Sequence, residues 1–331
     1  MAGDTTLVEL WRGGILESVH RGHAVICDAK GDVIASLGDP NAVIFPRSSC
    51  KMIQALPLVE SGLTLSDEQL ALSCASHQGA AIHTDRVTAW LNELGLAEAD
   101  LRCGAQVPAD KDAKFGLIRA HQEPCQIHNN CSGKHAGFLT LNQHIGGGAD
   151  YVDVDHPLQQ MVRDAFEGVT GETSPGFGID GCSAPNFATS VTGLARAMAQ
   201  FASAGQRSDA RAEAQQRLTA AMMKHPDLVA GETRACTELM RAMNGLAAIK
   251  TGAEAVFVAI VPGRGFGIAL KVTDGGTRGA EAAIAALLSK IGVLDENHPM
   301  ALKRSHGPLR NWRGIEVGEM RLAAPLAELT I

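Results

Sequence analysis

Two apolar stretches near the C-terminal end decide the fold: AVFVAIV (Ala255–Val261) and FGIALKV (Phe266–Val272). Short runs rich in Val, Ile and Phe, bounded by Gly and Pro, are typical of β-strands. Ala247–Lys250 is expected to be a strand before them, and Ile315–Leu322 a strand after them. A helix is expected between, over Ala280–Ile291. The chain is therefore predicted to return to β structure towards its end.

The beginning of the chain also predicts β structure, in the form of an antiparallel meander. Its β-rich runs are 7–11, 15–20, 24–28 and 33–37, with turn signals at Gly13-Gly14, Arg21-Gly22 and residues 29–32. Helical patterns fill the middle of the chain, at 48–60, from Ser66 onward, and at 83–94, 134–144, 157–167, 191–204, 210–224 and 233–243, with loop and short elements over 103–130.

This order of elements predicts an α/β protein. One antiparallel sheet formed by the two chain ends would pack against a mostly helical region, in a three-layer α/β/α arrangement. No linker-like stretch and no internal repeat interrupts the pattern, so we expect a single domain over residues 1–331.

Composition narrows the function classes. The net charge is −7 and aromatic residues make up only 4%, so neither a nucleic-acid-binding surface nor an anionic-membrane surface is expected. No apolar run approaches the roughly 20 residues of a membrane-spanning helix, and the N-terminus lacks the features of a signal peptide. We expect a cytoplasmic protein with a small-molecule partner, in which most of the eight cysteines are buried apolar side chains.

The first candidate for catalysis is Ser48, which precedes Lys51 by three residues where an extended segment gives way to a helix. Residues three apart on a helix share a face, so the lysine amine could take the proton of the serine hydroxyl. A lysine acts as such a base only when burial or nearby positive charge, here from Arg47, lowers its pKa. The structural alternative is a serine helix cap followed by a solvated lysine.

A second candidate is Lys250 in the sequence Lys250-Thr251-Gly252. Penicillin-recognising serine acyl hydrolases combine an early S-x-x-K motif with a late K-T-G motif on a strand. The S-D-N motif of those enzymes is missing here, which argues against a penicillin-binding enzyme. The structural alternative is an ordinary lysine at a strand end.

Cysteine-containing segments supply further candidates. Cys131, Lys134 and His135 fall within one turn at an expected helix N-terminus, where a cysteine is suited to nucleophilic attack or to binding a soft metal. Cys182 lies on another loop, two residues after Asp180. The spacing matches no standard zinc finger or ribbon, and residue types alone favour a glycine-containing turn with a buried cysteine.

Ser76, followed by His77, is a possible second hydroxyl near Ser48. Neighbouring side chains usually point apart, so the two do not form a catalytic pair by adjacency. Residue types alone favour the polar C-terminus of a helix that ends at Gly79.

Taken together, these motifs resemble the asparaginase II family, the Rhizobium etli-type L-asparaginases, over nearly the whole chain. The resemblance rests on VELWRGG (Val8–Gly14), ESVHRG (Glu17–Gly22), FPRSSCK (Phe45–Lys51), ASH (Ala75–His77), NCSGKH (Asn130–His135), DGCSAP (Asp180–Pro185), KTGAE (Lys250–Glu254) and GIALK (Gly267–Lys271). The chain departs from the family at Gln78-Gly79-Ala80, where relatives often carry a glutamate in the third place, and at Met52, where they often carry proline.

The resemblance implies a serine β-lactamase-like fold, a homodimer, and hydrolysis of L-asparagine to L-aspartate and ammonia. It also implies two Ser-Lys pairs, and a zinc ion (Zn²⁺) bound by two cysteines and a lysine, with three further residues near the substrate. Carried over by motif, the pairs are Ser48 with Lys51 and Ser76 with Lys250, the zinc ligands are Cys131, Lys134 and Cys182, and the surrounding residues are Arg47, His135 and Asp180.

Two rival functions stay open at this point. One is a β-lactamase-like or glutaminase-like serine amidohydrolase, which would act on another amide. The other is a non-catalytic relative that binds zinc or an amino acid, and the intact Ser-Lys pairs count against it.

Overall fold

A computed structural model describes residues 3–331 of the chain. The chain divides into two compact units, each built from separate segments. The first, which we call the sheet unit, contains the segments up to Ser49, Thr189–Ser203 and Glu238–Ile331. The second, the helical unit, contains Cys50–Ala188 and Ala204–Thr237. The single domain expected from the sequence stays a prediction.

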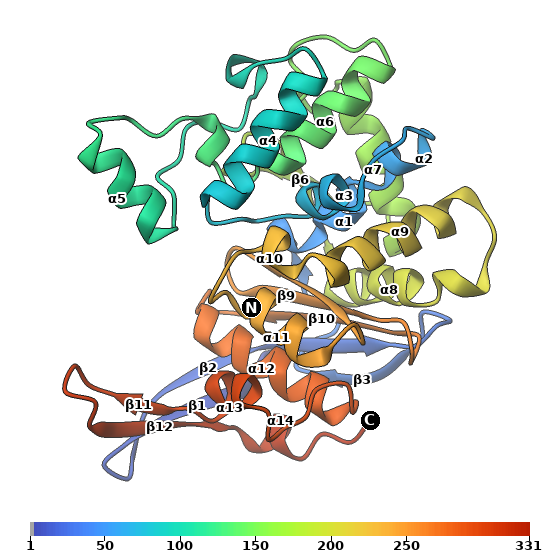
Figure 1. The fold of residues 1–331 in the computed structure, drawn as a ribbon. Coiled ribbons are helices and arrows are strands. Elements are labelled where there is room, and N and C mark those ends of the chain that lie inside the picture. The colour runs from blue at the N-terminus through green and yellow to red at the C-terminus, as the bar shows by residue number, and fades with distance from the viewer. Residues whose placement is uncertain (1–2) are drawn as a thin grey trace. The chain divides into compact units, whose positions relative to one another are not determined.

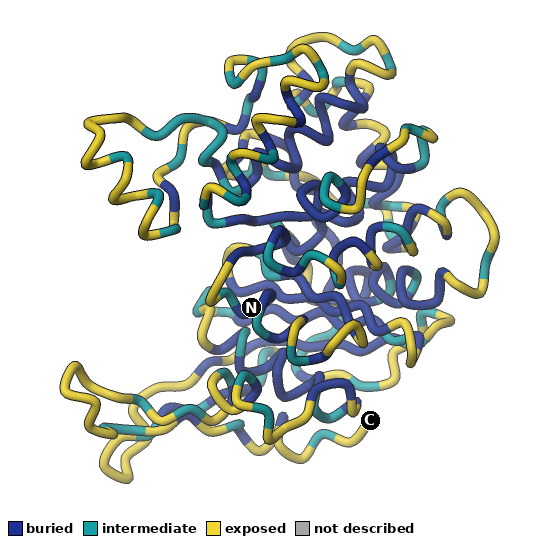
Figure 2. The backbone as a smooth tube through the Cα atoms, in the orientation of Figure 1, coloured by how far each residue is buried: buried dark blue, intermediate teal, exposed yellow. Residues whose placement is uncertain are grey.

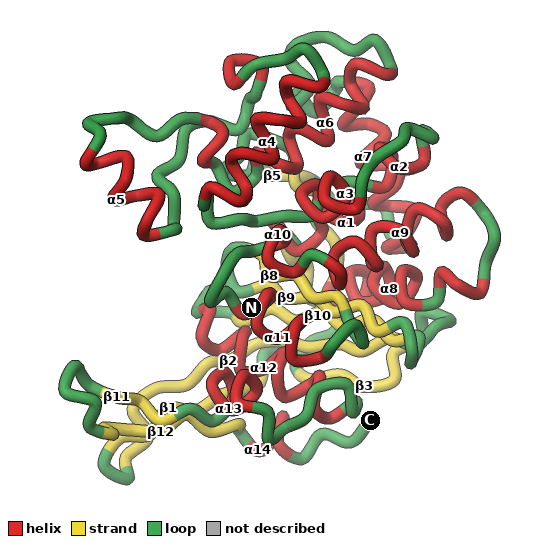
Figure 3. Tube along the Cα trace, viewed as in Figure 1, coloured by secondary structure: helices red, strands yellow, loops and turns green. Residues whose placement is uncertain are grey.

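The sheet unit contains one antiparallel sheet, drawn in yellow in Figure 3, whose strands come from both ends of the chain. The strand order is β11-β12-β1-β2-β10-β9-β8, with β3 paired to β2. This confirms the predicted sheet. The strands are β1 (Thr5–Arg12), β2 (Ile15–Cys27), β3 (Val33–Leu37), β8 (Ala248–Gly252), β9 (Val256–Val261), β10 (Phe266–Val272), β11 (Pro308–Arg310) and β12 (Glu316–Leu322), and a separate pair is formed by β4 (Val43–Ile44) and β7 (Thr189–Ser190).

Helices cover both faces of this sheet. The helices of the unit are α8 (Val191–Ala202), α12 (Thr277–Lys290), α13 (Pro299–Ser305) and α14 (Ala324–Ala327). On one face, Gly267 of β10 meets α8 so closely that a Cβ there would lie 2.0 Å from the backbone nitrogen of Ala199. On the other face, Gly279 of α12 approaches the side chain of His20 on β2. The sheet unit is thus a three-layer α/β/α sandwich, as predicted (Figure 1).

The central strands are apolar because both of their faces are covered. Every residue of β9 is buried, as are all residues of β10 after Phe266. Figure 2 shows these strands in dark blue, whereas the hairpin ends of β1–β2 and β11–β12 are exposed. The continuous apolar pattern that predicted these strands therefore reflects burial from two sides.

One predicted turn in this sheet is wrong. Arg21-Gly22 lies inside β2, which continues without a break. A Cβ at position 22 would lie 2.2 Å from the backbone oxygen of Lys271, so this glycine allows β10 to approach closely. The Gly13-Gly14 turn is confirmed, with positive φ angles of 57° and 79°.

The helical unit contains short helices and one small strand pair. Helix α3 begins at the capping box that Ser66 forms with Gln69, as the sequence predicted. The helices are α1 (Lys51–Gln54), α2 (Leu56–Glu60), α3 (Asp67–Ser73), α4 (Ala81–Glu93), α5 (Lys111–Arg119), α6 (Ser132–His144), α7 (Pro157–Thr170), α9 (Ala210–Lys224) and α10 (Pro226–Val229), and the strands are β5 (Phe177–Ile179) and β6 (Pro185–Phe187). Helix α11 (Ala235–Met243) spans a boundary between the units.

Helix α6 lies deep in the helical unit and is buried from Ser132 to Asn142. Two glycines let it pack closely against α3. A Cβ at Gly133 would lie 2.6 Å from the backbone oxygen of Leu72, and one at Gly137 would lie 2.8 Å from Ser73 Oγ. This packing holds the N-terminal turn of α6 next to the chain that follows α3. Among the described residues, no helix is long and apolar enough to cross a bilayer.

Candidate active site

In the sheet unit, Ser48 lies in a single 3₁₀ turn, Arg47–Cys50, that leads into α1. Arg47, directly before it, has a φ of 53°. A non-glycine residue in this left-handed region carries strain, and such residues gather at functional sites. The structure thus places the predicted nucleophile on a tight, half-exposed turn.

The strand that carries Lys250 lies against the same turn. Gly252, at the end of β8, comes so near that a Cβ would lie 2.6 Å from the backbone oxygen of Pro46 and 3.0 Å from the nitrogen of Ser49. Lys250 itself is fully buried, and its Nζ donates a hydrogen bond to the backbone oxygen of Thr251 at 2.6 Å. The absence of a side chain at Gly252 therefore brings the K-T-G segment beside the Ser48 turn.

In the helical unit, Lys51 is the centre of a buried polar cluster. Its Nζ donates to Ser76 Oγ at 3.1 Å, to Cys131 Sγ at 3.1 Å, and to the backbone oxygen of Ala75. Lys51 is 1% exposed and Ser76 is 6% exposed. A buried amine needs hydrogen-bond partners, and the nitrogen of Lys51 has three of them. Sequence spacing paired Lys51 with Ser48, and the family resemblance paired Ser76 with Lys250; the structure places Lys51 beside Ser76.

Cys131, which contacts this lysine, interacts with a second buried cysteine, Cys182. Cys131 and Cys182 interact directly, and the hydrogen bond that Cys131 donates holds the pKa of Cys182 well below its ordinary value. The same bond, together with burial, raises the pKa of Cys131. Lys134 Nζ contacts Cys182 Sγ at 3.0 Å and also favours its anionic form. The two cysteines of this pair thus have pKa values shifted in opposite directions, with the anionic form favoured at Cys182.

Charges around Lys134 keep its amine protonated. Burial alone would lower the pKa of Lys134, but the Cys182 and Cys131 sulfurs more than offset this effect, so the pKa is raised. Asp180, half-exposed on the loop before Cys182, acts in the same direction. For the neighbouring His135, burial lowers the pKa to about 4, so the imidazole is neutral near pH 7.

The cluster has donor atoms suited to a soft or borderline metal ion. Two sulfurs and one amine lie together in the buried interior, and thiolates are preferred zinc ligands. Within residues 3–331 no group of three or more His, Cys, Asp and Glu residues could hold a metal. The predicted ligand set contains only two residues of these types, because its third member is Lys134. The donor set fits zinc, provided that the amine of Lys134 loses its proton on binding.

Two buried residues of this region were not predicted to take part. His77 Nε2 lies 2.9 Å from Ser132 Oγ and so links the Ser76 segment to the start of α6. Tyr151 contacts His135 Nδ1 through its hydroxyl at 2.8 Å. Tyr151 is the single tyrosine of an aromatic-poor chain, which is the one signal that could have drawn attention to it.

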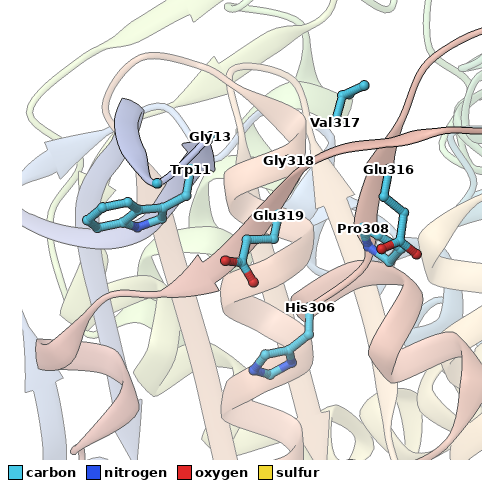
Figure 4. Close-up of a pocket in the computed structure, with 9 residues that line it drawn as sticks. Trp11, Gly13, His306, Pro308, Glu316, Val317, Gly318 and Glu319 are labelled. Carbon is cyan, nitrogen blue, oxygen red and sulfur yellow. The ribbon is translucent and has the colours of Figure 1, made fainter.

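A hollow of about 470 Å³ lies elsewhere in the sheet unit, on the two exposed hairpins (Figure 4). None of the predicted site residues borders it. The residues around it are Trp11, Gly13, Gly14, His306, Pro308, Glu316, Val317, Gly318 and Glu319.

Comparison with known proteins gives one family match. The family described as L-asparaginase II matches residues 8–322 of this chain. No curated protein matches it.

Several solved structures are similar at low sequence identity. A β-lactamase from Mycobacterium bovis has 14% identity and a TM-score of 0.43, covering 81% of this chain and 94% of that one. Mglu, in its tris and glutamate form, has 11% identity and a TM-score of 0.47, covering 84% and 60%. A penicillin-binding protein homologue from Pyrococcus abyssi, an octamer, has 12% identity and a TM-score of 0.38, covering 88% and 80%. At this level the likeness carries no argument about the residues of the site.

Proposed function

Because the chain belongs to the L-asparaginase II family, we propose that it hydrolyses L-asparagine to L-aspartate and ammonia. Membership of the family supports an amidohydrolase of the L-asparaginase type. The observation that carries the proposal further is the buried amine of Lys51, which is hydrogen-bonded to Ser76 Oγ and to Cys131 Sγ. The amine therefore lies beside the hydroxyl of Ser76 and beside one of the two cysteines proposed to bind zinc.

In the proposed first step, Ser48 Oγ attacks the carbon of the side-chain amide of asparagine. Its proton passes to the amine of Lys51, which must be neutral to accept it. The carbon–nitrogen bond then breaks, and the nitrogen takes a proton from the lysine and leaves as ammonia. The product of this step is a β-aspartyl ester of Ser48.

In the second step, water attacks the ester carbonyl carbon, and the bond to Ser48 Oγ breaks. Aspartate leaves with the new carboxylate, and Ser48 recovers a proton. Ser76 and Lys250 are proposed to relay protons or stabilise charge during both steps. Arg47, His135 and Asp180 are proposed to bind the substrate. A cationic Arg47 suits its α-carboxylate, and an anionic Asp180 suits its α-ammonium group.

We propose that Cys131, Lys134 and Cys182 hold a zinc ion. The lowered pKa of Cys182 supports this, because zinc binds the deprotonated form of a cysteine sulfur. When bound, the ion would supply positive charge next to the substrate, and we favour a role in positioning over one in activating water. The residues of the chain carry every bond-making step described above.

The assembly and the compartment are proposals too. A homodimer follows only from the family resemblance. A cytoplasmic location is supported by the eight cysteines, none of which is paired in a disulfide.

The proposed nucleophile can be tested with two neighbouring serines. Ser48→Ala is expected to lower kcat by about 10³-fold or more, because the residual rate would come from binding alone. Ser49→Ala removes the next hydroxyl, which donates to the backbone oxygen of Pro46 at 2.7 Å, and should keep most activity. Ammonia release is measured under saturating L-asparagine. If Ser48→Ala retained most of the wild-type rate, the nucleophile assignment would fail.

The substrate is tested with the same assay. Ammonia release from L-asparagine should exceed release from L-glutamine, and nitrocefin should not be turned over. Faster turnover of glutamine or nitrocefin would instead support one of the rival serine hydrolases. Asparagine binding without ammonia release would indicate a non-catalytic relative.

A further inference from the structure

Tyr151 lies at the end of a short hydrogen-bonded chain in the helical unit. It is the only tyrosine in the sequence and is 0% exposed. Its hydroxyl oxygen accepts a hydrogen bond from the backbone N–H of Arg102 at 2.9 Å. The same oxygen lies 2.8 Å from Nδ1 of His135, whose ring is also fully buried.

The hydroxyl proton determines which nitrogen of His135 carries a proton. A phenol has one proton to donate, and leaving it buried without an acceptor is unfavourable. Among the described residues, His135 Nδ1 is the acceptor within hydrogen-bond distance of this hydroxyl. Nδ1 can accept only when it is unprotonated, so the ring proton must be on Nε2.

The Nε2 atom of His135 is buried and has no hydrogen-bond partner of ordinary geometry among residues 3–331. His135 directly follows Lys134, whose Nζ contacts Cys182 Sγ at 3.0 Å, so its ring belongs to the same buried cluster as this sulfur. An N–H group buried without an acceptor is costly. The fold nevertheless keeps this donor buried, which indicates that an acceptor in the sulfur cluster forms a hydrogen bond with it.

We propose that Tyr151 is a positioning residue, whose hydroxyl keeps the proton of His135 on Nε2 so that this N–H supports the Cys182 sulfur as a metal ligand. The metal half of this inference rests on the zinc ion of the proposed function. The half that concerns the proton on His135 stands on the hydrogen bonds alone. Partners that orient metal ligands typically change metal affinity by about 10–100-fold when they are removed.

The position of the proton can be read by NMR on the full-length protein with ¹⁵N-labelled histidine. The His135 signals are identified by their loss in His135→Gln. Wild-type His135 should show a protonated Nε2 and an unprotonated Nδ1. Tyr151→Phe keeps the ring but removes the hydroxyl, and should move His135 towards a protonated Nδ1. A protonated Nδ1 in the wild type, or no change in Tyr151→Phe, overturns the inference.

A double-mutant cycle separates this role from simple packing. Zinc affinity is measured by competition with a chelator, using zinc alone as the probe. Tyr151→Phe should weaken zinc binding about tenfold. In a His135→Gln background, where the glutamine amide supplies a donor without tautomers, the same change should have no further effect. An equal loss in both backgrounds, or a wild-type chain that binds no zinc, overturns the role in metal support.

Neither measurement depends on turnover. If ammonia release fails while the proton of His135 is found on Nε2, the proposed function is contradicted and the role of Tyr151 in holding that proton stands.

Discussion

The two units position their candidate residues in different ways. In the sheet unit, Ser48 and Lys250 are placed by backbone contacts, since Gly252 allows β8 to lie against the turn over Arg47–Cys50. In the helical unit, the candidates are held by direct contacts between buried side chains, with the amine of Lys51 at the centre. The backbone arrangement depends on how closely the two segments can approach, whereas a buried polar cluster depends on each of its members.

The largest expected effect comes from breaking the side-chain cluster. Lys51→Met keeps the length of the side chain but removes its amine, so Ser76 and Cys131 lose their shared partner. Because a positioned acid–base group contributes typically about 10²–10⁴-fold to the rate, kcat for asparagine should fall by that factor. Lys111→Met makes the same replacement at an exposed position on α5 and should leave the rate unchanged. Steady-state ammonia release that differs little between the two variants would contradict a central role for Lys51.

A smaller effect is expected from the backbone contact. The Cβ of Gly252→Ala would push β8 away from Pro46, and a displacement of about 1 Å can cost about 10²-fold in kcat. Gly263→Ala is the matched control, because a Cβ there meets nothing within 4 Å. Rates and urea unfolding of both variants would be compared with those of the wild type. Wild-type turnover in Gly252→Ala would show that the close approach is not needed for catalysis.

The smallest effect concerns stability and pH in the helical unit. His77 and His83 are stacked with ring centroids 4.8 Å apart, and burial lowers the pKa of both. Their folded pKa values lie below the value of the unfolded chain, so the unfolded state binds more protons in acid. The free energy of unfolding should therefore be fully retained above about pH 6.5 and decrease below it, by up to about 1.4 kcal/mol per pH unit for each histidine.

Glutamine does not titrate, so His83→Gln should reduce this pH dependence. Its side chain can still donate to the backbone oxygen of Asp227, which His83 Nε2 contacts at 2.9 Å. His144→Gln, at an exposed position on α6, should leave it unchanged. The comparison is urea unfolding from about pH 7.5 down to about pH 5.5, a range that brackets the ordinary histidine pKa. Equal slopes in wild type and His83→Gln would be evidence against this explanation.

Much of the fold could be predicted because its signals are local. Helix α9 and strand β10 have the predicted bounds, since α9 has a capping residue in Asp209 and β10 is buried on both faces. Helix α5 was expected to be loop and short elements, and none of its residues is buried. A helix without a buried face leaves no apolar periodicity for the sequence to show. Gly22 was predicted to lie in a turn because glycine is common in turns. Glycine is also found where two backbones approach closely, and the sequence does not distinguish the two cases.

The candidate site could be predicted from the sequence less fully than the fold. The S-x-x-K and K-T-G motifs drew attention to Ser48, Lys51 and Lys250, and the cysteine segments followed from the family resemblance. The contact between Lys51 and Cys131, however, joins residues 80 positions apart. No pattern in the sequence encodes such a contact, because it depends on how α1 and the start of α6 pack together in the folded chain. The roles assigned to these residues stay predictions.

The most direct test of the proposed function is ammonia release from L-asparagine by the full-length wild-type protein, with and without a zinc chelator. We predict release from the zinc-loaded protein. Removal of zinc should raise KM more than it lowers kcat, because we assign the ion a role in positioning the substrate. If neither preparation released ammonia, the assignment of this chain as an L-asparaginase would be contradicted.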